Sequence, residues 1–247
     1  MSQKSRDEIT PLRSPEPATA SPRSEIKVSP RSEIDAFLAQ VKSLTSTAAP
    51  GQRGRLVFAL DATMSRQPTW DTACKLQADM FKEAASIGGL DVQLVYFRGF
   101  SECRSSSFVS EPQRLAALME RIDCRGGHTQ IGRVITHMRR ETEKARVQAL
   151  VFIGDAMEEA IDELRVAAAE LGSRGIRAFM FQEGNDAKVE CAFREIARLT
   201  HGAYCRFDAG APRQLAELLR AVAAYAAGGV KALETKPGAE TLLEQLV

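Results

Sequence analysis

The chain has 247 residues and a mass of 27.0 kDa, which is enough for one full-sized domain with a buried core and about fifty further residues. Its apolar fraction (44%) and charged fraction (26%) are those of an ordinary globular protein. The net charge of +1 gives no field that would favour nucleic acid or a membrane surface, so the composition excludes partners held by bulk charge.

Residues 1–32 are rich in Ser, Pro, Arg and Glu and nearly lack aromatic and β-branched residues. Such a segment cannot bury enough apolar surface to offset its ordering entropy, so we expect a disordered leader. The hexapeptide Ser-Pro-Arg-Ser-Glu-Ile occurs at 21–26 and again at 29–34, either as a tandem docking or phosphorylation motif or as drift of low-complexity sequence. The beginning of the chain also lacks the apolar run of a signal peptide, which predicts a cytoplasmic protein.

Residues 33–53 are predicted to form a short helix and a linker. The apolar residues of this segment recur at helical spacing, which predicts a helix that packs on the following domain. They are Ile34, Phe37, Leu38, Val41 and Leu44.

Residues 54–228 alternate short apolar runs with amphipathic segments, and residues 229–247 are expected to form a loose tail. This alternation predicts an α/β fold, in which a doubly wound, mostly parallel sheet is covered by helices on both faces. Residues 101–105 are expected to add a short antiparallel edge strand. The predicted strands are 55–60, 91–97, 148–153, 176–181 and 203–207, and the predicted helices are 69–87, 130–146, 159–173, 188–200 and 213–227.

Polar residues follow the strands at the points where an open parallel sheet binds its ligands. Asp61, Thr63 and Ser65 come directly after the first strand, on alternate positions of a turn. Asp155 comes directly after the strand at 148–153. Between them, two glycines precede His128 and Thr129 and give the backbone freedom to bring the Thr129 hydroxyl near the other groups.

Two carboxylates and three hydroxyls suit a small hard cation. Mg²⁺ and Mn²⁺ prefer oxygen ligands in a roughly octahedral shell that retains water. One coordination position would remain for an oxygen from outside the chain. Capping of the loop or helix that follows would explain Asp61 or Asp155 taken alone, but not both together with the two glycines and Thr129. His128 is either a ligand or base, or a solvated loop residue.

D-x-T-x-S after the first strand, a later Gly-Gly-x-Thr and an Asp after the fourth strand resemble the metal-ion-dependent adhesion site of the von Willebrand factor A family. The resemblance spans residues 54–227. It implies a doubly wound sheet, one Mg²⁺ or Mn²⁺, and a protein partner whose Asp or Glu completes the coordination. The implied metal-site residues are Asp61, Thr63, Ser65, Thr129 and Asp155.

Some residues depart from the family pattern. Thr63 stands where Ser is more usual and keeps the hydroxyl, and Met64 stands where Gly is frequent and stiffens or shades the loop. Glu158 and Glu159 add carboxylates near the third motif, where they either tune the charge or cap the helix that follows them.

The function that we expect is protein binding by a non-enzymatic, intracellular, bacterial-type module that serves in assembly of a complex, without nucleic acid or membrane. One alternative is a Mg²⁺-dependent phosphohydrolase of the haloacid-dehalogenase type. That class needs a second carboxylate where this chain has Thr63, and a Lys near the third motif. The other alternative is a metal-free scaffold on the same fold.

The five cysteines are odd in number and widely spaced, and none forms a C-x-x-C pair. This pattern indicates neither a disulfide framework nor a zinc site. Buried free thiols in a reducing compartment are expected instead, in agreement with a cytoplasmic location.

Overall fold

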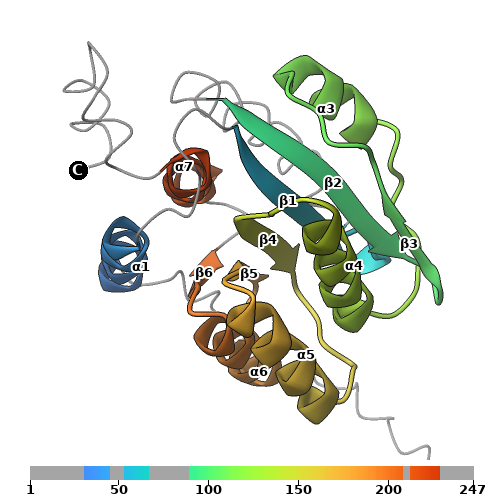
Figure 1. Ribbon diagram of the computed structural model, residues 1–247. Helices are drawn as coiled ribbons and strands as arrows, with labels where there is room; N and C mark the ends of the chain where they lie inside the picture. The colour runs from blue at the N-terminus through green and yellow to red at the C-terminus, as the bar shows by residue number, and fades with distance from the viewer. Residues whose placement is uncertain (1–30, 45–52, 67–88, 208–211, 229–247) are drawn as a thin grey trace, which may run out of the picture.

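A six-stranded sheet forms the centre of the molecule. The computed structural model describes residues 31–44, 53–66, 89–207 and 212–228 (Figure 1). The strand order is β3-β2-β1-β4-β5-β6, and β3 alone among these strands runs antiparallel to its neighbour. The strands are β1 (Gly54–Asp61), β2 (Leu90–Arg98), β3 (Glu102–Ser105), β4 (Ala149–Gly154), β5 (Arg177–Glu183) and β6 (Ala203–Phe207).

Helices cover both faces of this sheet. α1, α3 and α7 contribute to an apolar core on one face, and α4, α5 and α6 contribute to a second core on the other (Figure 1). The central strands are therefore buried on both sides, which explains their nearly continuous apolar sequence. The helices are α1 (Arg31–Ser43), α3 (Pro112–Met119), α4 (Ile131–Lys144), α5 (Ile161–Ser173), α6 (Ala187–Leu199) and α7 (Pro212–Ala227), and the short 3₁₀ turn η1 is Met64–Arg66.

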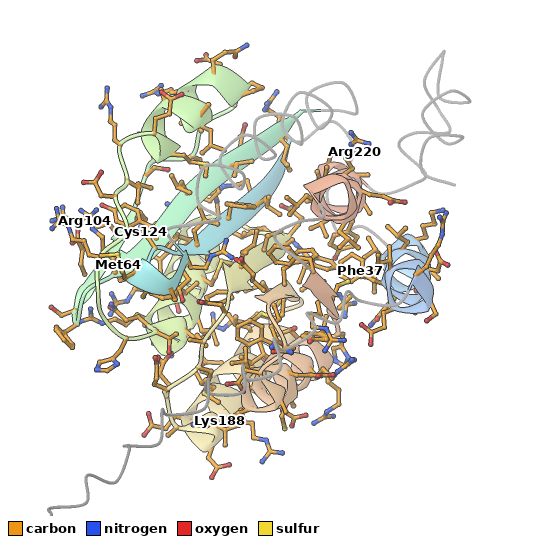
Figure 2. All side chains as sticks on the ribbon, turned by 180° about the vertical axis from the view of Figure 1, so that it is seen from behind. Phe37, Met64, Arg104, Cys124, Lys188 and Arg220 are labelled. Carbon is orange, nitrogen blue, oxygen red and sulfur yellow. The ribbon has the colours of Figure 1, made fainter. Side chains whose placement is uncertain are left out.

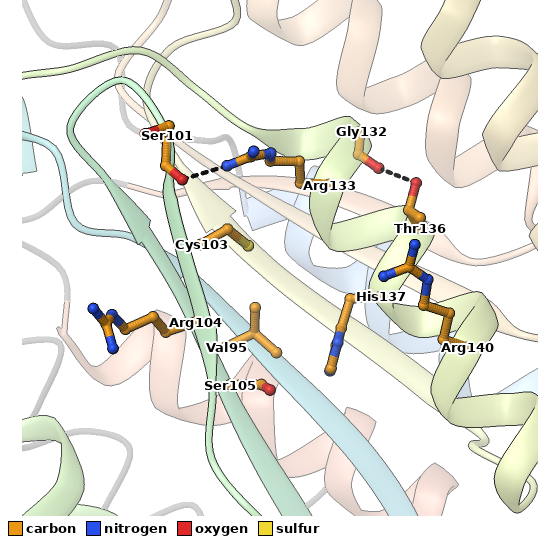
Figure 3. Close-up of a pocket in the computed structure, with 10 residues that line it drawn as sticks. All are labelled: Val95, Ser101, Cys103, Arg104, Ser105, Gly132, Arg133, Thr136, His137 and Arg140. Atoms are coloured by element: carbon orange, nitrogen blue, oxygen red, sulfur yellow. Dashed lines mark hydrogen bonds between the residues drawn. The ribbon is translucent and has the colours of Figure 1, made fainter.

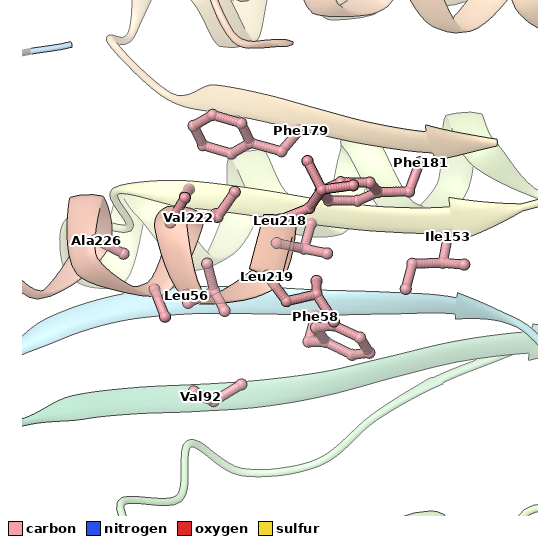
Figure 4. Packing of buried hydrophobic residues seen from close by; sticks show 14 of the residues in the cluster. Leu56, Phe58, Val92, Ile153, Phe179, Phe181, Leu218, Leu219, Val222 and Ala226 are labelled. Atoms are coloured by element: carbon pink, nitrogen blue, oxygen red, sulfur yellow. The ribbon is translucent and has the colours of Figure 1, made fainter. Parts of the chain in front are cut away.

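α7 fills the first core. Its apolar residues, among them Leu218 and Val222, pack over β1 and β5, where they meet Phe58 and Phe179 (Figure 4). All four of these side chains are fully buried. Burial of a Leu or Phe side chain stabilises the fold by about 1.5–3 kcal/mol, so this layer contributes a large part of the stability.

The predicted N-terminal helix is confirmed as α1. Its apolar residues face inward, and Phe37 lies between the helix and the sheet, where its ring meets Phe181 at a centroid distance of 5.3 Å (Figure 2). Gln40 also donates a hydrogen bond to the Gly202 carbonyl at 2.6 Å. The helix begins at Arg31, so its first two residues belong to the segment that the sequence assigned to the leader.

The predicted α/β fold class is confirmed, including the antiparallel edge strand. Strand and helix limits differ from the predicted ones by a few residues, and α3 was not predicted. Predictions for the leader up to residue 30, the helix at 69–87 and the tail at 229–247 lie outside the described residues.

The described cysteines are all free. Cys124 and Cys205 are buried as expected, but Cys191 is exposed and Cys103 only partly covered, so the expectation of uniformly buried thiols was wrong. Among the described helices, none has the length and apolar character needed to cross a membrane.

Candidate metal-binding site

Asp61 and Asp155 lie at the carboxyl ends of two adjacent central strands. β1 and β4 are paired in parallel, with Leu60 opposite Ile153, so the next residues of both strands come out at the same edge of the sheet. The chain runs outward from β1 through β2 to β3, and then returns to β4 on the other side of β1. The strand order thus reverses at this point, where open α/β sheets bind their ligands.

The first motif folds back on itself. The backbone N–H of Thr63 donates to Asp61 Oδ1 at 2.8 Å, and the hydroxyls of Thr63 and Ser65 are 3.0 Å apart. Asp61 and Thr63 are buried, whereas Ser65 is exposed. Asp61 Oδ2 is also buried but has no hydrogen-bond partner among the described residues. One carboxylate oxygen is therefore fixed by the turn, and the other is available to a ligand.

Burial raises the pKa of Asp61 from 3.8 to about 6. The hydrogen bonds from Thr63 and the charge of Arg66 lower this pKa, while the nearby charge of Asp155 raises it. The charge of Asp155 is thus close enough to that of Asp61 to make its ionisation less favourable. Two such groups favour a bound cation, which would neutralise both.

Asp155 provides a second unsatisfied oxygen. The residue is only partly exposed, and its Oδ1 is buried without a hydrogen-bond partner among the described residues. Buried carboxylate oxygens without a partner are rare in native proteins, since each costs free energy. Their presence at neighbouring strand ends fits a site for a ligand that supplies positive charge.

Thr129 is brought to this edge by the loop that carries the second motif. The N–H of Arg125 donates to the Ala62 carbonyl at 3.0 Å, and the N–H of His128 donates to the Gly99 carbonyl at 3.2 Å. The loop is thereby fixed between the end of β1 and the turn after β2. Thr129 itself is buried.

Glu158 connects the second motif to the third. The Thr129 hydroxyl donates to Glu158 Oε2 at 2.7 Å and accepts the Glu158 N–H at 3.1 Å. A hydroxyl has one donor and two acceptor lone pairs, so one lone pair of Thr129 remains for a cation. The sequence left open whether Glu158 tunes the charge of the site or caps a helix. In the structure, Glu158 orients the Thr129 hydroxyl through these two hydrogen bonds.

Glu159 caps a helix, but not the one that follows it. Its carboxylate accepts the N–H groups of Ile131 at 2.5 Å and Gly132 at 2.9 Å, which are the first two residues of α4. Of the two roles that the sequence left open for Glu159, the capping of the following helix, α5, is therefore wrong, because the carboxylate is taken up by the N–H groups of α4 and α5 has no side-chain cap. Burial raises the pKa of Glu159, and these N–H groups oppose the rise.

Removal of this cap should destabilise the protein. We expect Glu159→Ala to lower the free energy of unfolding by about 1–2 kcal/mol, because two partly buried N–H groups at the start of α4 lose their acceptor. Glu159→Gln should cost less, since its amide oxygen still accepts one of these bonds. Urea unfolding measures the difference, and the exposed Glu163→Ala in α5 is the control. Equal stability of Glu159→Ala and Glu163→Ala would show that the cap contributes nothing.

The five candidate metal ligands include neither His nor Cys, the side chains that bind soft metals. Within the described ranges, no three His, Cys, Asp or Glu side chains group together as a metal cluster. The candidate site instead offers two carboxylates and three hydroxyls, and such oxygen ligands suit a hard cation better than zinc. The His128 ring makes an edge contact with the ring of Phe100, with 5.2 Å between the two ring centroids.

Comparison with solved structures identifies the architecture. A von Willebrand factor type A structure from Catenulispora acidiphila matches with a TM-score of 0.57 and 19% identity, over 70% of this chain and 42% of that one. An aerotolerance-related membrane protein from Bacteroides fragilis matches with a TM-score of 0.51 and 19% identity, over 67% of this chain and 98% of that one. This chain has a von Willebrand factor A-like fold.

A third match concerns a metal site of this fold. Proximal thread matrix protein 1 from the mussel byssus, with a zinc-occupied MIDAS motif, has a TM-score of 0.55 and 14% identity, over 69% of this chain and 46% of that one. The present chain thus spans less than half of this structure and of the Catenulispora structure. No protein-family model and no curated protein matches the sequence.

A buried arginine beside the first motif of this von Willebrand factor A-like fold was not predicted. Arg66, at the end of η1, is 1% exposed and forms an ion pair with Glu183 at the end of β5. A buried charge requires such a partner. The pair balances its own charge, so Arg66 lowers the pKa of Asp61 without making this edge of the sheet net positive. The sequence has no local signal for a contact between residues this far apart.

Exposed apolar side chains border the site. Met64, within η1, is 55% exposed, and Phe100, in the turn between β2 and β3, is 79% exposed. Val166 on α5 is the remaining large apolar residue that is exposed in the described part of the chain. Two of the three thus lie beside the first and second motifs.

Proposed function

We propose that the chain binds one Mg²⁺ or Mn²⁺ through Asp61, Thr63, Ser65, Thr129 and Asp155, and that the cation holds an Asp or Glu of a protein partner. The observation that supports this most directly is the pair of buried, unsatisfied carboxylate oxygens, Asp61 Oδ2 and Asp155 Oδ1, at adjacent strand ends. These residues fit the bound group because both oxygens need a positive partner.

The chain's own groups prepare this site. The Thr63 N–H holds Asp61 by a hydrogen bond. Glu158 accepts a hydrogen bond from the Thr129 hydroxyl, so that a lone pair of this hydroxyl is free for the cation. A bound Mg²⁺ or Mn²⁺ would supply Lewis acidity toward an incoming carboxylate. Neutral hydroxyls add ligands without cancelling the charge of the ion, so attraction for an external carboxylate is retained.

The rim supports a protein as the partner. Met64 and Phe100 offer exposed apolar surface next to the site, and the ring of Phe100 is held against His128. Interfaces often combine such an apolar anchor with a charged contact that fixes its register. The free thiols of the described cysteines agree with an intracellular, cytoplasmic complex, as in a bacterial-type member of this fold.

Catalysis is the less supported alternative. A haloacid-dehalogenase-type phosphohydrolase needs an acid–base carboxylate two residues after the first aspartate, where this chain has Thr63. The Thr63 hydroxyl lies instead beside that of Ser65. Phosphatase activity with Mg²⁺ that disappears in Asp61→Asn would favour the enzyme over our proposal.

Metal binding should stabilise the protein. A cation that binds only the folded state stabilises it by about 2.7 kcal/mol when its concentration is a hundred times its Kd. We therefore expect millimolar Mn²⁺ to raise the melting temperature and EDTA to reverse the rise. Asp61→Ala should abolish the response, whereas Asp162→Ala, a residue with an 88% exposed side chain in α5, should keep it.

Isothermal titration with Mn²⁺ separates this proposal from the metal-free scaffold. Heat that is absent in the wild type at millimolar Mn²⁺ would favour the scaffold. A partner captured in Mn²⁺ should be released by EDTA and should not bind Asp61→Ala. Capture that survives both changes would contradict a metal-dependent contact.

A further inference from the structure

A groove separates the edge strand β3 from helix α4. Its volume is about 510 Å³, and its base includes Val95 and Cys103 (Figure 3). One wall is β3 with its preceding turn, and the other is the outward face of α4. The walls consist mostly of polar and basic residues, in contrast to the apolar cores of the fold.

Two arginines of α4 make this groove positive. Arg133 and Arg140 are exposed, lie two helical turns apart and line the same wall (Figure 3). Arg133 donates to neutral oxygens, the Ser101 carbonyl and Gln130 Oε1. Within the described part of the chain, neither arginine forms an ion pair with a carboxylate. Both charges are therefore available to an anionic ligand.

The acidic groups nearest the groove are already bound to other partners. Glu102 accepts hydrogen bonds from Arg98 at 3.0 Å and from Arg104 at 2.8 Å. Glu159 is held by the first N–H groups of α4, and Glu141 by Lys144 at 2.6 Å. Glu102 lies between two arginines and Glu141 is paired with Lys144, so Glu159 is the one of these three carboxylates whose charge is not balanced by a neighbouring cation among the described residues. The two charges of Arg133 and Arg140 exceed this single negative charge, and the groove remains net positive.

β3 presents unpaired backbone groups along this groove. The Ser106 N–H donates to the Leu94 carbonyl at 2.8 Å, so residues 94 and 106 are a hydrogen-bonded pair. In an antiparallel ladder such pairs alternate, which places the N–H and C=O groups of Cys103 and Ser105 on the side away from β2. Since β3 is the last strand of the described sheet, these groups point to an open edge.

We propose that this groove binds an extended acidic peptide of a partner protein, which adds to β3 as a further strand. Its backbone would pair with Cys103 and Ser105, and its acidic side chains on the α4 side would meet Arg133 and Arg140. The arginines are about 10 Å apart along the helix, and alternate residues of a strand about 7 Å apart. The arginine side chains are long and flexible enough to bridge the difference of about 3 Å between these two spacings. Strand addition draws affinity from main-chain hydrogen bonds and specificity from side-chain contacts.

The test is fluorescence anisotropy with a labelled peptide of roughly eight residues that alternates Glu and Val, a length typical of a strand. The titration is done in EDTA, and repeated with Asp61→Ala, so that the candidate metal site takes no part. We expect saturable binding that weakens with salt. Arg133→Glu/Arg140→Glu should weaken it at least about tenfold, because like charges then face the peptide. The matched control is Arg114→Glu/Arg121→Glu, two exposed arginines from α3 and the residues after it.

Further variants separate strand pairing from simple attraction of charge. Ser105→Pro removes an outward N–H without loss of a ladder bond, so the fold should persist while binding weakens about tenfold. Ser105→Ala keeps that N–H and should bind as the wild type does. Since Arg133 contacts Ser101, Arg140→Glu alone provides a variant that leaves this contact in place, and it should weaken binding about threefold.

Several results would overturn the proposal. A peptide that alternates Glu and Pro has the same charge but lacks alternate backbone donors, so equal affinity for it would exclude strand addition. Equal affinity for a Lys–Val peptide would exclude the charge contact. Unchanged binding by the double arginine variant or by Ser105→Pro would assign the peptide to another surface.

Discussion

Asp61→Asn should make the metal-free protein more stable, although it removes the central carboxylate of the candidate site. The Asp61 carboxylate is buried, and its pKa is raised from 3.8 to about 6, which corresponds to a cost of about 3 kcal/mol for the ionised form at neutral pH. Asparagine has the same shape and can still accept the Thr63 N–H. Its buried amide N–H groups need partners, so we expect a net gain of about 1–2 kcal/mol.

The gain should depend on pH. A carboxyl whose folded-state pKa is raised contributes stability that is fully present below pH 3.8 and is lost as the pH rises through about 6. The buried amide of asparagine has its cost at every pH, so the wild type should be the more stable of the two near pH 4 and become the less stable above pH 6. Urea unfolding in EDTA across this range measures the difference, with the exposed Asp162→Asn as the control.

Mn²⁺ should reverse this order at neutral pH. The cation would neutralise the buried charge in the wild type and find no such charge in Asp61→Asn, so the wild type should then be the more stable protein. A variant that is less stable than the wild type even in EDTA would instead give Asp61 a structural role, in which its charge holds the turn of the first motif.

The strands and long helices could be predicted because their cause is local. β1, β4 and β5 read as short apolar runs since both of their faces are covered, and amphipathic spacing predicted α4 through α7. α3 was missed because it is short and buries only Leu115 and Met119 among its apolar residues. Too few residues carry its periodicity for a helix to be distinguished from a loop.

The positions of the candidate metal ligands at the strand ends could be predicted from the sequence, but the side-chain contacts around them could not. The sequence placed Asp61 and Asp155 at one edge, because parallel strands end together, and the structure brings them there. It could not predict that Glu159 would cap α4 or that Arg66 would pair with Glu183. Those contacts join segments that are distant in the chain and depend on the packing of whole elements.

The two glycines of the second motif, which look equivalent in the sequence, differ in the structure. A Cβ on Gly127 would lie 2.1 Å from the Gly99 carbonyl oxygen and 2.5 Å from Gly99 Cα, whereas a Cβ on Gly126 would meet nothing within 4 Å. The backbone at Gly127 thus packs directly on the turn after β2. The same approach allows the His128 N–H to reach the Gly99 carbonyl.

Gly127→Ala should therefore damage both the fold and the candidate site, and Gly126→Ala should damage neither. The added methyl must push the loop away from Gly99, which costs about 1–3 kcal/mol, as overpacking does elsewhere. It should also displace Thr129 from Asp61 and Asp155, so Mn²⁺ affinity should fall at least about tenfold, or about 1.4 kcal/mol. Urea unfolding and Mn²⁺ titration measure the two effects, and Gly126→Ala should stay within about 1 kcal/mol of the wild type. Equal behaviour of the two variants would show that the close approach of Gly127 to Gly99 does not position the second motif.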